Sequence, residues 1–444
     1  MKLRSPHDAD IARLAVPALG TLVAEPLYVL ADTAIVGHIG TDELAGLALA
    51  STVLLGAYGL LIFLAYGTTA TVSRLIGAGD EERGARVSVQ GLWLASLLGV
   101  GFGLAIAVGA RPLLRALGGA GPVLEAGRVY LTFSTLGLPF LLMTLAGSGA
   151  FHGRQDTRTP LMIAIAGAGA NLVLEVVLIF GLGFGIGASA LATVMAQVAT
   201  GLVFARRVIG WARSQGVSLG PDRAILAGLL RAGRPLMLRT MALRGAFTLA
   251  TAAAARIGVI EVAAHQVAIQ VWSTLALSLD AVAIAGQALI GRWLGAGAAV
   301  RAQEAATRMI QLDVALGAAA GLAVLALRHP IAGIFSQDPE LAATTAYLLV
   351  WVAVAEPING YVFALDGVLI GAGDLAYLGR SMVVVSAVFV GLAATVMGTG
   401  AGLGWLWTAL TAFMGLRAAA VWWRWRSGRW IVTGANPSLG PSGP

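Results

Sequence analysis

The sequence contains no cysteine, only one lysine among 444 residues, and few charged residues of any kind. The absence of cysteine excludes disulfides, thiolate metal sites and thiol nucleophiles. Charged residues make up 11% of the chain, whereas soluble domains carry about a quarter. With 58% hydrophobic residues and a mean hydropathy of +0.84, the composition indicates an integral membrane protein.

Sequence motifs of metal chemistry are also absent. The chain has no His-Glu-x-x-His and no paired metal-ligand spacing, and its single Gly-x-Ser-x-Gly match, at residues 216–220, lies in the polar connector between the halves. We therefore expect neither an enzyme nor a bound cofactor. The alternating pattern of a membrane β-barrel is missing as well, and runs of Leu, Ala and Gly dominate, so we expect an all-α membrane protein.

Hydrophobic runs separated by charged or Gly/Pro-rich breaks divide the chain into membrane spans. A crossing needs about 20 apolar residues, so 444 residues leave room for roughly a dozen spans and little soluble domain. We predict twelve transmembrane helices, at 10–38, 44–72, 87–110, 124–147, 160–181, 186–206, 228–257, 262–291, 309–328, 341–369, 381–398 and 402–423.

The net charge of +7 comes from 28 arginines and one lysine that are scattered through short loops. With the N-terminus inside, the inner segments hold 21 of these residues and the outer segments 5, and 3 fall within spans. The positive-inside rule accounts for this pattern, so we expect the lipid bilayer and not nucleic acid as the partner. It predicts a multi-pass protein of the inner (cytoplasmic) membrane with both termini in the cytoplasm.

An internal repeat relates the two halves of the chain. A shift of 218 positions needs no gap between residues 13 and 156, and six spans per repeat predict two six-helix lobes related by a pseudo-twofold axis along the membrane normal. We expect an N-terminal lobe at 1–206, a cytoplasmic connector at 207–227, a C-terminal lobe at 228–425 and a cytoplasmic tail at 426–444. The superposed pairs include Arg13 with Arg231, Pro17 with Pro235, Glu43 with Glu261, Arg74 with Arg292, Pro139 with Pro357 and Asp156 with Asp374.

Two six-helix bundles joined by a cytoplasmic loop favour an alternating-access carrier, which we expect to act as a monomer. A channel is the alternative, although channels more often build their pores from oligomeric symmetry. A membrane scaffold without transport activity is a third hypothesis.

Two carboxylates stand out in the first span, Glu25 and Asp32, on either side of Pro26. They are seven residues apart, about two turns, and so lie near one face of one helix. A carboxylate at mid-bilayer costs about 2.5–3.5 kcal/mol on insertion scales, and such acids usually mark ion or substrate pathways. Asp32 corresponds to Ala250 in the repeat, so only the first half carries it. We predict Asp32 as the working centre and Glu25 as an accessory.

The fifth span adds Asn171 and Glu175, one helical turn apart in an otherwise apolar run. A single buried polar residue usually makes a helix-packing hydrogen bond, which is the alternative for Asn171. Thr193 in the sixth span either joins them or bonds its own helix backbone. Together with Asp32 these residues predict a polar pocket, in which a proton can be gained and lost.

The second half has acids of its own at Asp280, Glu356 and Asp366, and none of their repeat counterparts is charged. Asn359 and Tyr361 lie near the last two and complete a weaker set of candidates. For Asp280 and Asp366 the alternative is an ion pair with Arg239 or Arg244 inside the membrane.

Four stretches, in order, resemble the multidrug and toxic compound extrusion (MATE) transporters, in particular their DinF-like branch. They are Ala31-Asp-Thr-Ala-Ile-Val-Gly-His-Ile-Gly40, Arg74-Leu-Ile-Gly-Ala-Gly79, the run from Asn171 through Glu175 to Thr193, and Leu365-Asp-Gly-Val-Leu-Ile-Gly-Ala-Gly-Asp374. The similarity covers nearly the whole chain.

The resemblance implies export of cationic or amphipathic small molecules in exchange for protons or sodium. It assigns the family's first-helix aspartate to Asp32, its fifth-helix Asn-x-x-x-Asp to Asn171 and Glu175, and its sixth-helix threonine to Thr193. Glu175 departs from the family by one methylene. The seventh-helix glutamate of the sodium-linked branch has no equivalent between Thr248 and Arg256, so we expect protons as the coupling ion, with sodium as the alternative. A lipid-linked sugar flippase of the same superfamily should show an Arg-lined cleft, for which the chain offers Arg239, Arg244 and Arg417.

Overall fold

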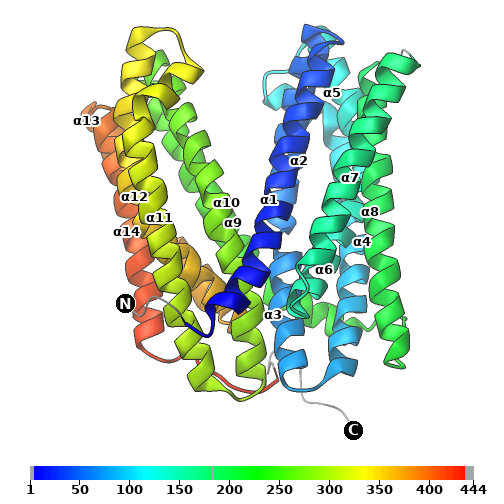
Figure 1. Cartoon of the computed structure of the whole chain (residues 1–444). Helices are drawn as coiled ribbons and strands as arrows, with labels where there is room; N and C mark the ends of the chain where they lie inside the picture. The colour runs from blue at the N-terminus through cyan, green and yellow to red at the C-terminus, as the bar shows by residue number, and fades with distance from the viewer. Residues whose placement is uncertain (1–4, 183–184, 436–444) are drawn as a thin grey trace. The chain divides into compact units, whose positions relative to one another are not determined.

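The computed structural model describes residues 5–182 and 185–435, and every regular element in these ranges is helical (Figure 1). The first half holds α1 (Asp8–Gly37), α2 (Thr41–Leu61), α3 (Phe63–Gly77), α4 (Glu81–Ala116), α5 (Gly121–Ser134), η1 (Thr135–Gly137), α6 (Leu138–Gly153), α7 (Arg158–Val176), η2 (Val177–Gly181) and α8 (Ile186–Ser214). The second half holds α9 (Arg223–Ile257), α10 (Val259–Gly295), α11 (Ala299–Phe335), α12 (Pro339–Gly371), α13 (Leu375–Thr399) and α14 (Leu403–Arg426).

The twelve predicted spans are confirmed as twelve helical segments in the predicted order. Three segments contain a local irregularity: α2 continues into α3, α5 continues through η1 into α6, and α7 ends in η2. The 3-10 turn η1 precedes Pro139, whose ring removes a backbone donor and clashes with the preceding turn. Within the described residues, ten segments are long and apolar enough to cross a membrane. The remaining two, α9 and α14, carry six and three arginines.

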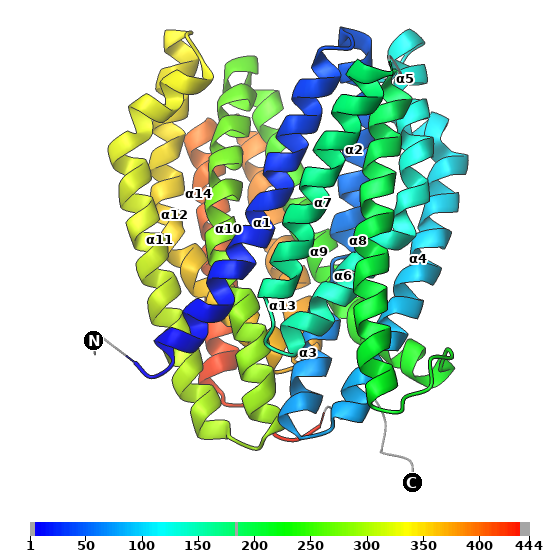
Figure 2. The same cartoon turned by 45° about the vertical axis from the view of Figure 1, so that its right-hand side comes forward.

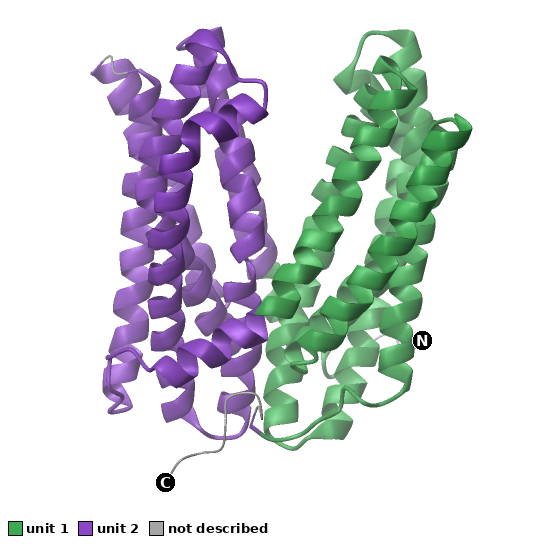
Figure 3. Cartoon of the chain, turned by 180° about the vertical axis from the view of Figure 1, so that it is seen from behind, with its two compact units in different colours: residues 1–16, 234–434 green, residues 17–233, 435–444 purple. Residues whose placement is uncertain are grey.

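The chain forms two compact units, coloured separately in Figure 3. The N-terminal unit comprises residues 17–233, and the C-terminal unit comprises residues 234–434 together with the described part of residues 1–16. The first residues were expected in the N-terminal lobe. They group with the C-terminal unit because Asp8 binds Arg308 through two hydrogen bonds and the His7 ring lies 5.1 Å from the ring of Trp293, edge to face.

The connector between the halves is shorter than the expected 207–227, because α8 continues to Ser214 and α9 begins at Arg223. Two side chains of α4, Gln90 and Trp93, hydrogen-bond to the segment between these helices. Gln90 donates from Nε2 to the carbonyl oxygen of Gly220 at 2.8 Å and accepts from the backbone N–H of Asp222 at 2.8 Å. The last helix, α14, ends at Arg426, the first residue of the expected tail, and residues 436–444 lie outside the described residues.

The internal repeat extends to the packing inside each unit. In the N-terminal unit α6 packs against α3, α4 and α8, and in the C-terminal unit α12 packs against α10, α11 and α14. The close approaches recur at the same shift of 218. A Cβ added at Gly149 would lie 2.5 Å from the Ala65 carbonyl oxygen, and one at Gly367 would lie 2.5 Å from that of Ala283. The two units therefore use the same small-residue contacts between helices.

The ends of corresponding helices also repeat. The helix segments ending at Gly77 and Gly295 are both followed by a glycine in the left-handed region, Gly79 at φ 79° and Gly297 at φ 74°. Residues with a Cβ rarely adopt this conformation, so glycine stops both helices in the same way.

Candidate functional site

Asp32 lies on α1, buried within the N-terminal unit with 5% of its surface exposed. Its Oδ1 is 2.7 Å from the hydroxyl oxygen of Ser189 on α8, and its Oδ2 accepts from the hydroxyl of Tyr130 on α5 at 3.5 Å. Helices α1, α5 and α8 thus all supply groups around one carboxylate. The predicted working centre is an interior group with hydrogen-bonding neighbours.

Glu175 lies on α7, which packs against α8 (Figure 2). Its side chain is fully buried, and Oε1 is 2.7 Å from the same Ser189 hydroxyl oxygen that contacts Asp32. Its second oxygen, Oε2, has no hydrogen-bond partner among the described residues. One serine therefore bridges the two carboxyl groups that the sequence predicted to share a pocket.

Asn171 and Thr193 form the adjoining part of the cluster. The amide Nδ2 of Asn171 donates to the hydroxyl oxygen of Thr193 at 3.3 Å, and the hydroxyl of Tyr28 lies 2.9 Å from the same oxygen. Thr193 thus bonds to side chains of other helices, contrary to the alternative that it bonds only its own backbone. We name the set Asp32, Asn171, Glu175, Ser189 and Thr193, with Tyr28 and Tyr130, the polar cluster.

Sequence reasoning missed three members of the polar cluster: Ser189, Tyr28 and Tyr130. Hydroxyl residues in apolar helices usually bond to the preceding turn, so a single one carries little signal. Two signals were nevertheless present. Tyr28 lies one turn before Asp32 on the same helix face, and the 218-residue shift places Ser189 on Trp407, a large change of side chain.

The polar cluster has an apolar twin in the C-terminal unit. The shift takes Asp32 to Ala250, Asn171 to Phe389, Glu175 to Ala393, Ser189 to Trp407, Tyr28 to Ala246 and Tyr130 to Leu348. All six counterparts belong to one buried hydrophobic cluster of that unit. The seventh member, Thr193, corresponds to Thr411, whose hydroxyl donates to the backbone carbonyl of Trp407 in its own helix. At six of the seven positions, equivalent helices therefore carry polar side chains in one unit and apolar side chains in the other.

Asp366 in the C-terminal unit is an ion-pair residue. It accepts hydrogen bonds from Arg239 on α9 and from Arg417 on α14, the latter at 3.0 Å. The sequence left an ion pair with Arg239 as the alternative for Asp366, and the structure contains it. Arg244 is exposed on α9 and forms no ion pair among the described residues. Asp280 is half-buried on α10.

Glu356 and Asn359 form a second, smaller polar contact in α12. Asn359 donates from Nδ2 to Oε1 of Glu356 at 3.0 Å, and both side chains are fully buried. Asp313 on α11, which no sequence pattern singled out, is also fully buried, and a Cβ added at Gly360 of α12 would lie 2.2 Å from its backbone carbonyl oxygen. Tyr361 is half-buried and is not part of this contact.

Glu25, the accessory candidate, lies apart from the polar cluster. Its Oε2 accepts from the hydroxyl of Tyr58 on α2 at 3.3 Å. No hydrogen bond of the described residues links it to Asp32. The structure thus brings together the four principal site residues and leaves Glu25 outside them.

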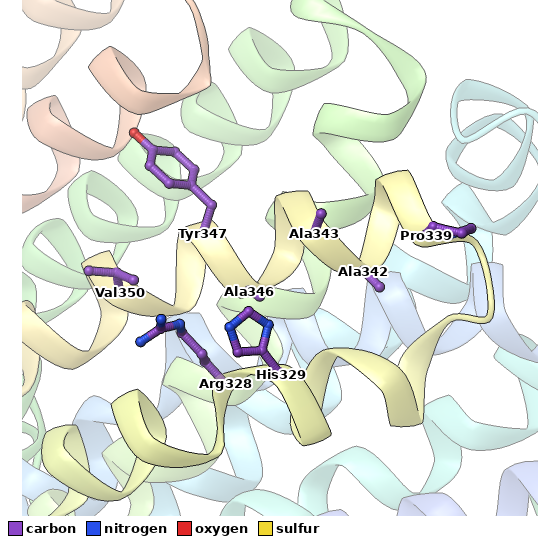
Figure 4. Close-up of a pocket in the computed structure, with 8 residues that line it drawn as sticks. All are labelled: Arg328, His329, Pro339, Ala342, Ala343, Ala346, Tyr347 and Val350. Atoms are coloured by element: carbon purple, nitrogen blue, oxygen red, sulfur yellow. The ribbon is translucent and has the colours of Figure 1, made fainter.

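A separate cavity of about 510 Å³ lies between α11 and α12 in the C-terminal unit (Figure 4). Arg328 and His329 line it from α11, and Ala342, Ala343 and Tyr347 from α12. None of the predicted site residues lines this cavity. Within the described ranges, no group of three or more His, Cys, Asp or Glu side chains is arranged to hold a metal ion.

Known proteins are similar to this chain over most of its length. The profile of the MatE family matches residues 17–177 and 235–397. Protein DETOXIFICATION 44, chloroplastic, of Arabidopsis thaliana is 32% identical over 96% of this chain and 84% of its own length. DNA damage-inducible protein F of Escherichia coli (strain K12) is 32% identical over 97% of this chain and 96% of its own.

A solved structure of a MOP superfamily transporter from Pyrococcus furiosus has a similar fold. It superposes with a TM-score of 0.86 at 23% identity, covering 99% of this chain and 98% of that one. For that transporter, the reverse polarity of its binding pocket is described as suggesting a different function. At this identity the likeness concerns the fold, and it includes both six-helix halves.

Proposed function

Because the chain belongs to the MATE family of membrane transporters, in its DinF-like branch, we propose that it exports cationic or amphipathic small molecules in exchange for protons. Members of this family are transporters and not enzymes. The direction, the substrate class and the coupling ion are our proposal, and so is the alternating-access cycle between the lobes at 1–206 and 228–425. We further propose that the chain acts as a monomer in the inner (cytoplasmic) membrane with both termini in the cytoplasm.

The observation that supports this proposal is the pairing of Asp32 and Glu175 through one hydroxyl inside the membrane. Two carboxyl groups this close in a low-dielectric interior are costly to charge together, so their charge depends on whether a proton is bound. No arginine or lysine forms an ion pair with either acid in the described parts of the chain. A proton or a substrate cation is then the natural counter-charge.

The proposed mechanism is competition for one negative charge. With Asp32 ionised, the polar cluster attracts a cationic substrate, and Asn171, Thr193 and the tyrosine hydroxyls supply hydrogen bonds. A proton arriving from outside neutralises Asp32 and weakens the hold on the cation. Because Asp32 lies six residues after Pro26 on α1, the change is also positioned to alter the bend of that helix.

Sodium coupling is the main alternative, since Asp32, Asn171, Glu175 and Thr193 also offer oxygen ligands. The two hypotheses differ in what drives transport. Sodium would bind to these oxygens without protonating a carboxyl group, so a sodium gradient and not a pH gradient would drive substrate movement. The flippase hypothesis needs exposed arginines along a cleft. Arg239 and Arg417 instead bind Asp366, which argues against it.

The test is transport of ethidium, a cationic amphipathic dye, by purified protein in liposomes. We expect a pH gradient to drive ethidium movement and a sodium gradient at constant pH to drive none. Asp32→Asn should abolish this movement while the protein is made and folded normally. Asp42→Asn, at an exposed position in the first turn of α2, is the matched control and should transport as wild type does. Full transport by Asp32→Asn would refute the proposed role of Asp32. Ethidium movement driven by a sodium gradient would show that sodium, and not the proton, is the coupling ion.

A further inference from the structure

Ser189 occupies a position in the polar cluster that constrains where the hydrogens can be. The side chain is fully buried, and its oxygen lies 2.7 Å from Oδ1 of Asp32 and 2.7 Å from Oε1 of Glu175. Both distances are typical of short O–H···O hydrogen bonds. Each contact therefore needs one hydrogen between its two oxygens.

A serine hydroxyl has one hydrogen to donate, and an ionised carboxylate has none. Ser189 can thus supply the hydrogen for one contact only. The other contact must contain the hydrogen of a carboxylic acid that donates to the serine oxygen. The geometry fits a cluster that holds one acidic proton shared between two carboxyl groups, with the hydroxyl between them.

We propose that Ser189 relays a proton between Asp32 and Glu175 during transport, which rests on the proposed proton coupling. In the relay the O–H bond of protonated Asp32 breaks and its proton passes to the Ser189 oxygen. The original Ser189 O–H bond breaks at the same time, and that proton passes to Oε1 of Glu175. The serine keeps one hydrogen, Asp32 becomes a carboxylate, and Glu175 becomes a neutral acid.

The surroundings of the two acids give the relay a direction. Asp32 has 5% of its surface exposed, whereas Glu175 is fully buried. The Asp32 carboxylate has a second donor in the Tyr130 hydroxyl at 3.5 Å, but Oε2 of Glu175 has no hydrogen-bond partner among the described residues. The negative charge is therefore better supported on Asp32 and the proton on Glu175. Asp32 is the entry point, and Glu175 stores the proton.

The relay would regenerate a charged Asp32 after the first proton has entered. A substrate cation could then bind at Asp32 while Glu175 keeps its proton, and a second proton arriving at Asp32 would release the cation. Without the hydroxyl, the cluster would lose the two hydrogen-bond contacts through which Ser189 joins Glu175 to Asp32. Ser189 is in this sense a positioning residue for proton transfer, and the substrate need not touch it.

The relay is tested by Ser189→Ala, which removes the hydroxyl, and Ser189→Thr, which keeps one. Ser88→Ala is the matched control, because Ser88 is equally buried but donates only to the Gly84 carbonyl of its own helix, at 2.9 Å. The measurement is pH-gradient-driven ethidium transport in liposomes over a series of pH values, with melting temperature as a check of folding.

We expect Ser189→Ala to lower the rate about tenfold or more. Ser189→Thr should restore much of the rate, and Ser88→Ala should match wild type. The relay is refuted if Ser189→Ala matches wild type while Asp32→Asn is inactive, and the proposed function then stands. If Asp32→Asn also transports fully, the proposed function fails with it. Equal loss in folded Ser189→Ala and Ser189→Thr would also refute the relay.

Discussion

Arg308 binds Asp8 through two parallel hydrogen bonds, from Nε to Oδ1 at 2.6 Å and from Nη2 to Oδ2 at 2.9 Å, across 300 positions of sequence. The fork of the guanidinium matches the carboxylate, which makes this geometry specific. The contact attaches the start of α1 to α11 within the C-terminal unit.

Asp8→Asn should therefore loosen the described part of the first 16 residues. The amide keeps one acceptor oxygen but loses the charge and the paired geometry. We expect faster hydrogen exchange in residues 8–16 with little change in α4. The control is Asp10→Asn, because Asp10 pairs only with Arg13 on the exposed surface. Equal exchange in Asp8→Asn and wild type would contradict the attachment.

Asp366→Asn should destabilise the C-terminal unit more than Arg417→Met does. Without Asp366, the buried guanidinium of Arg417 and that of Arg239 lose their shared carboxylate, and breaking a buried ion pair costs roughly 3–5 kcal/mol. Without Arg417, Asp366 still binds Arg239. Melting temperatures in detergent check the order, and a larger fall for Arg417→Met would show that this account of the ion pairs is wrong.

Glu175→Asp should impair transport without unfolding the protein. The side chain becomes shorter by one carbon–carbon bond of about 1.5 Å, which breaks the 2.7 Å contact with Ser189 unless α7 moves. We expect a several-fold lower rate of ethidium transport at an unchanged melting temperature. Glu81→Asp, at an exposed position in the first turn of α4, is the control. A rate equal to wild type would mean that the pocket tolerates the longer distance.

Gly149→Ala and Gly367→Ala should both lower the melting temperature, because the added methyl group would lie 2.5 Å from a backbone carbonyl oxygen of the neighbouring helix. Backbone cannot swing aside as a flexible side chain can, so the helices must separate. Gly101→Ala in α4 has nothing within 4 Å of the new methyl group and should be neutral or stabilising. Unequal effects at Gly149 and Gly367 would weaken the equivalence of the two packing contacts.

The natural absence of cysteine makes the proposed topology directly testable. Single cysteines at Ser218, between α8 and α9, and at Ala120, between α4 and α5, occupy exposed loop positions. With both termini in the cytoplasm, a membrane-impermeant thiol reagent should label Ala120→Cys in whole cells. It should label Ser218→Cys only after the membrane is opened. The reverse pattern would invert the topology.

The sequence predicted two kinds of feature: those marked by a local run of residues, and those marked by a charged residue whose burial in the membrane costs free energy. A membrane span is a long run of apolar residues, so all twelve could be located, although loops of three to four residues let helices such as α11 continue beyond the predicted 309–328. Asp32 and Glu175 stood out because ionisable residues inside a membrane are energetically costly and usually functional. Thr193 was a candidate from its place in the next span, and the family resemblance assigned it to the same site.

The features that escaped prediction have weak local signals or distant partners. Ser189 is one small hydroxyl in a helix, and its role comes only from the two acids that α1 and α7 bring to it. Nothing near Asp8 in the sequence indicates Arg308. The pairing of Asp366 with Arg239 was foreseen as an alternative, but its second partner, Arg417, lies 51 positions away on α14.

The polar cluster and its apolar twin show that one helical frame can hold two opposite kinds of interior. The six counterpart positions that run from Ala246 to Trp407 fill with hydrocarbon and aromatic rings in one half, and their partners fill with acids, an amide and hydroxyls in the other. The fold of the helices therefore leaves the polarity of the interior to the side chains at these six positions.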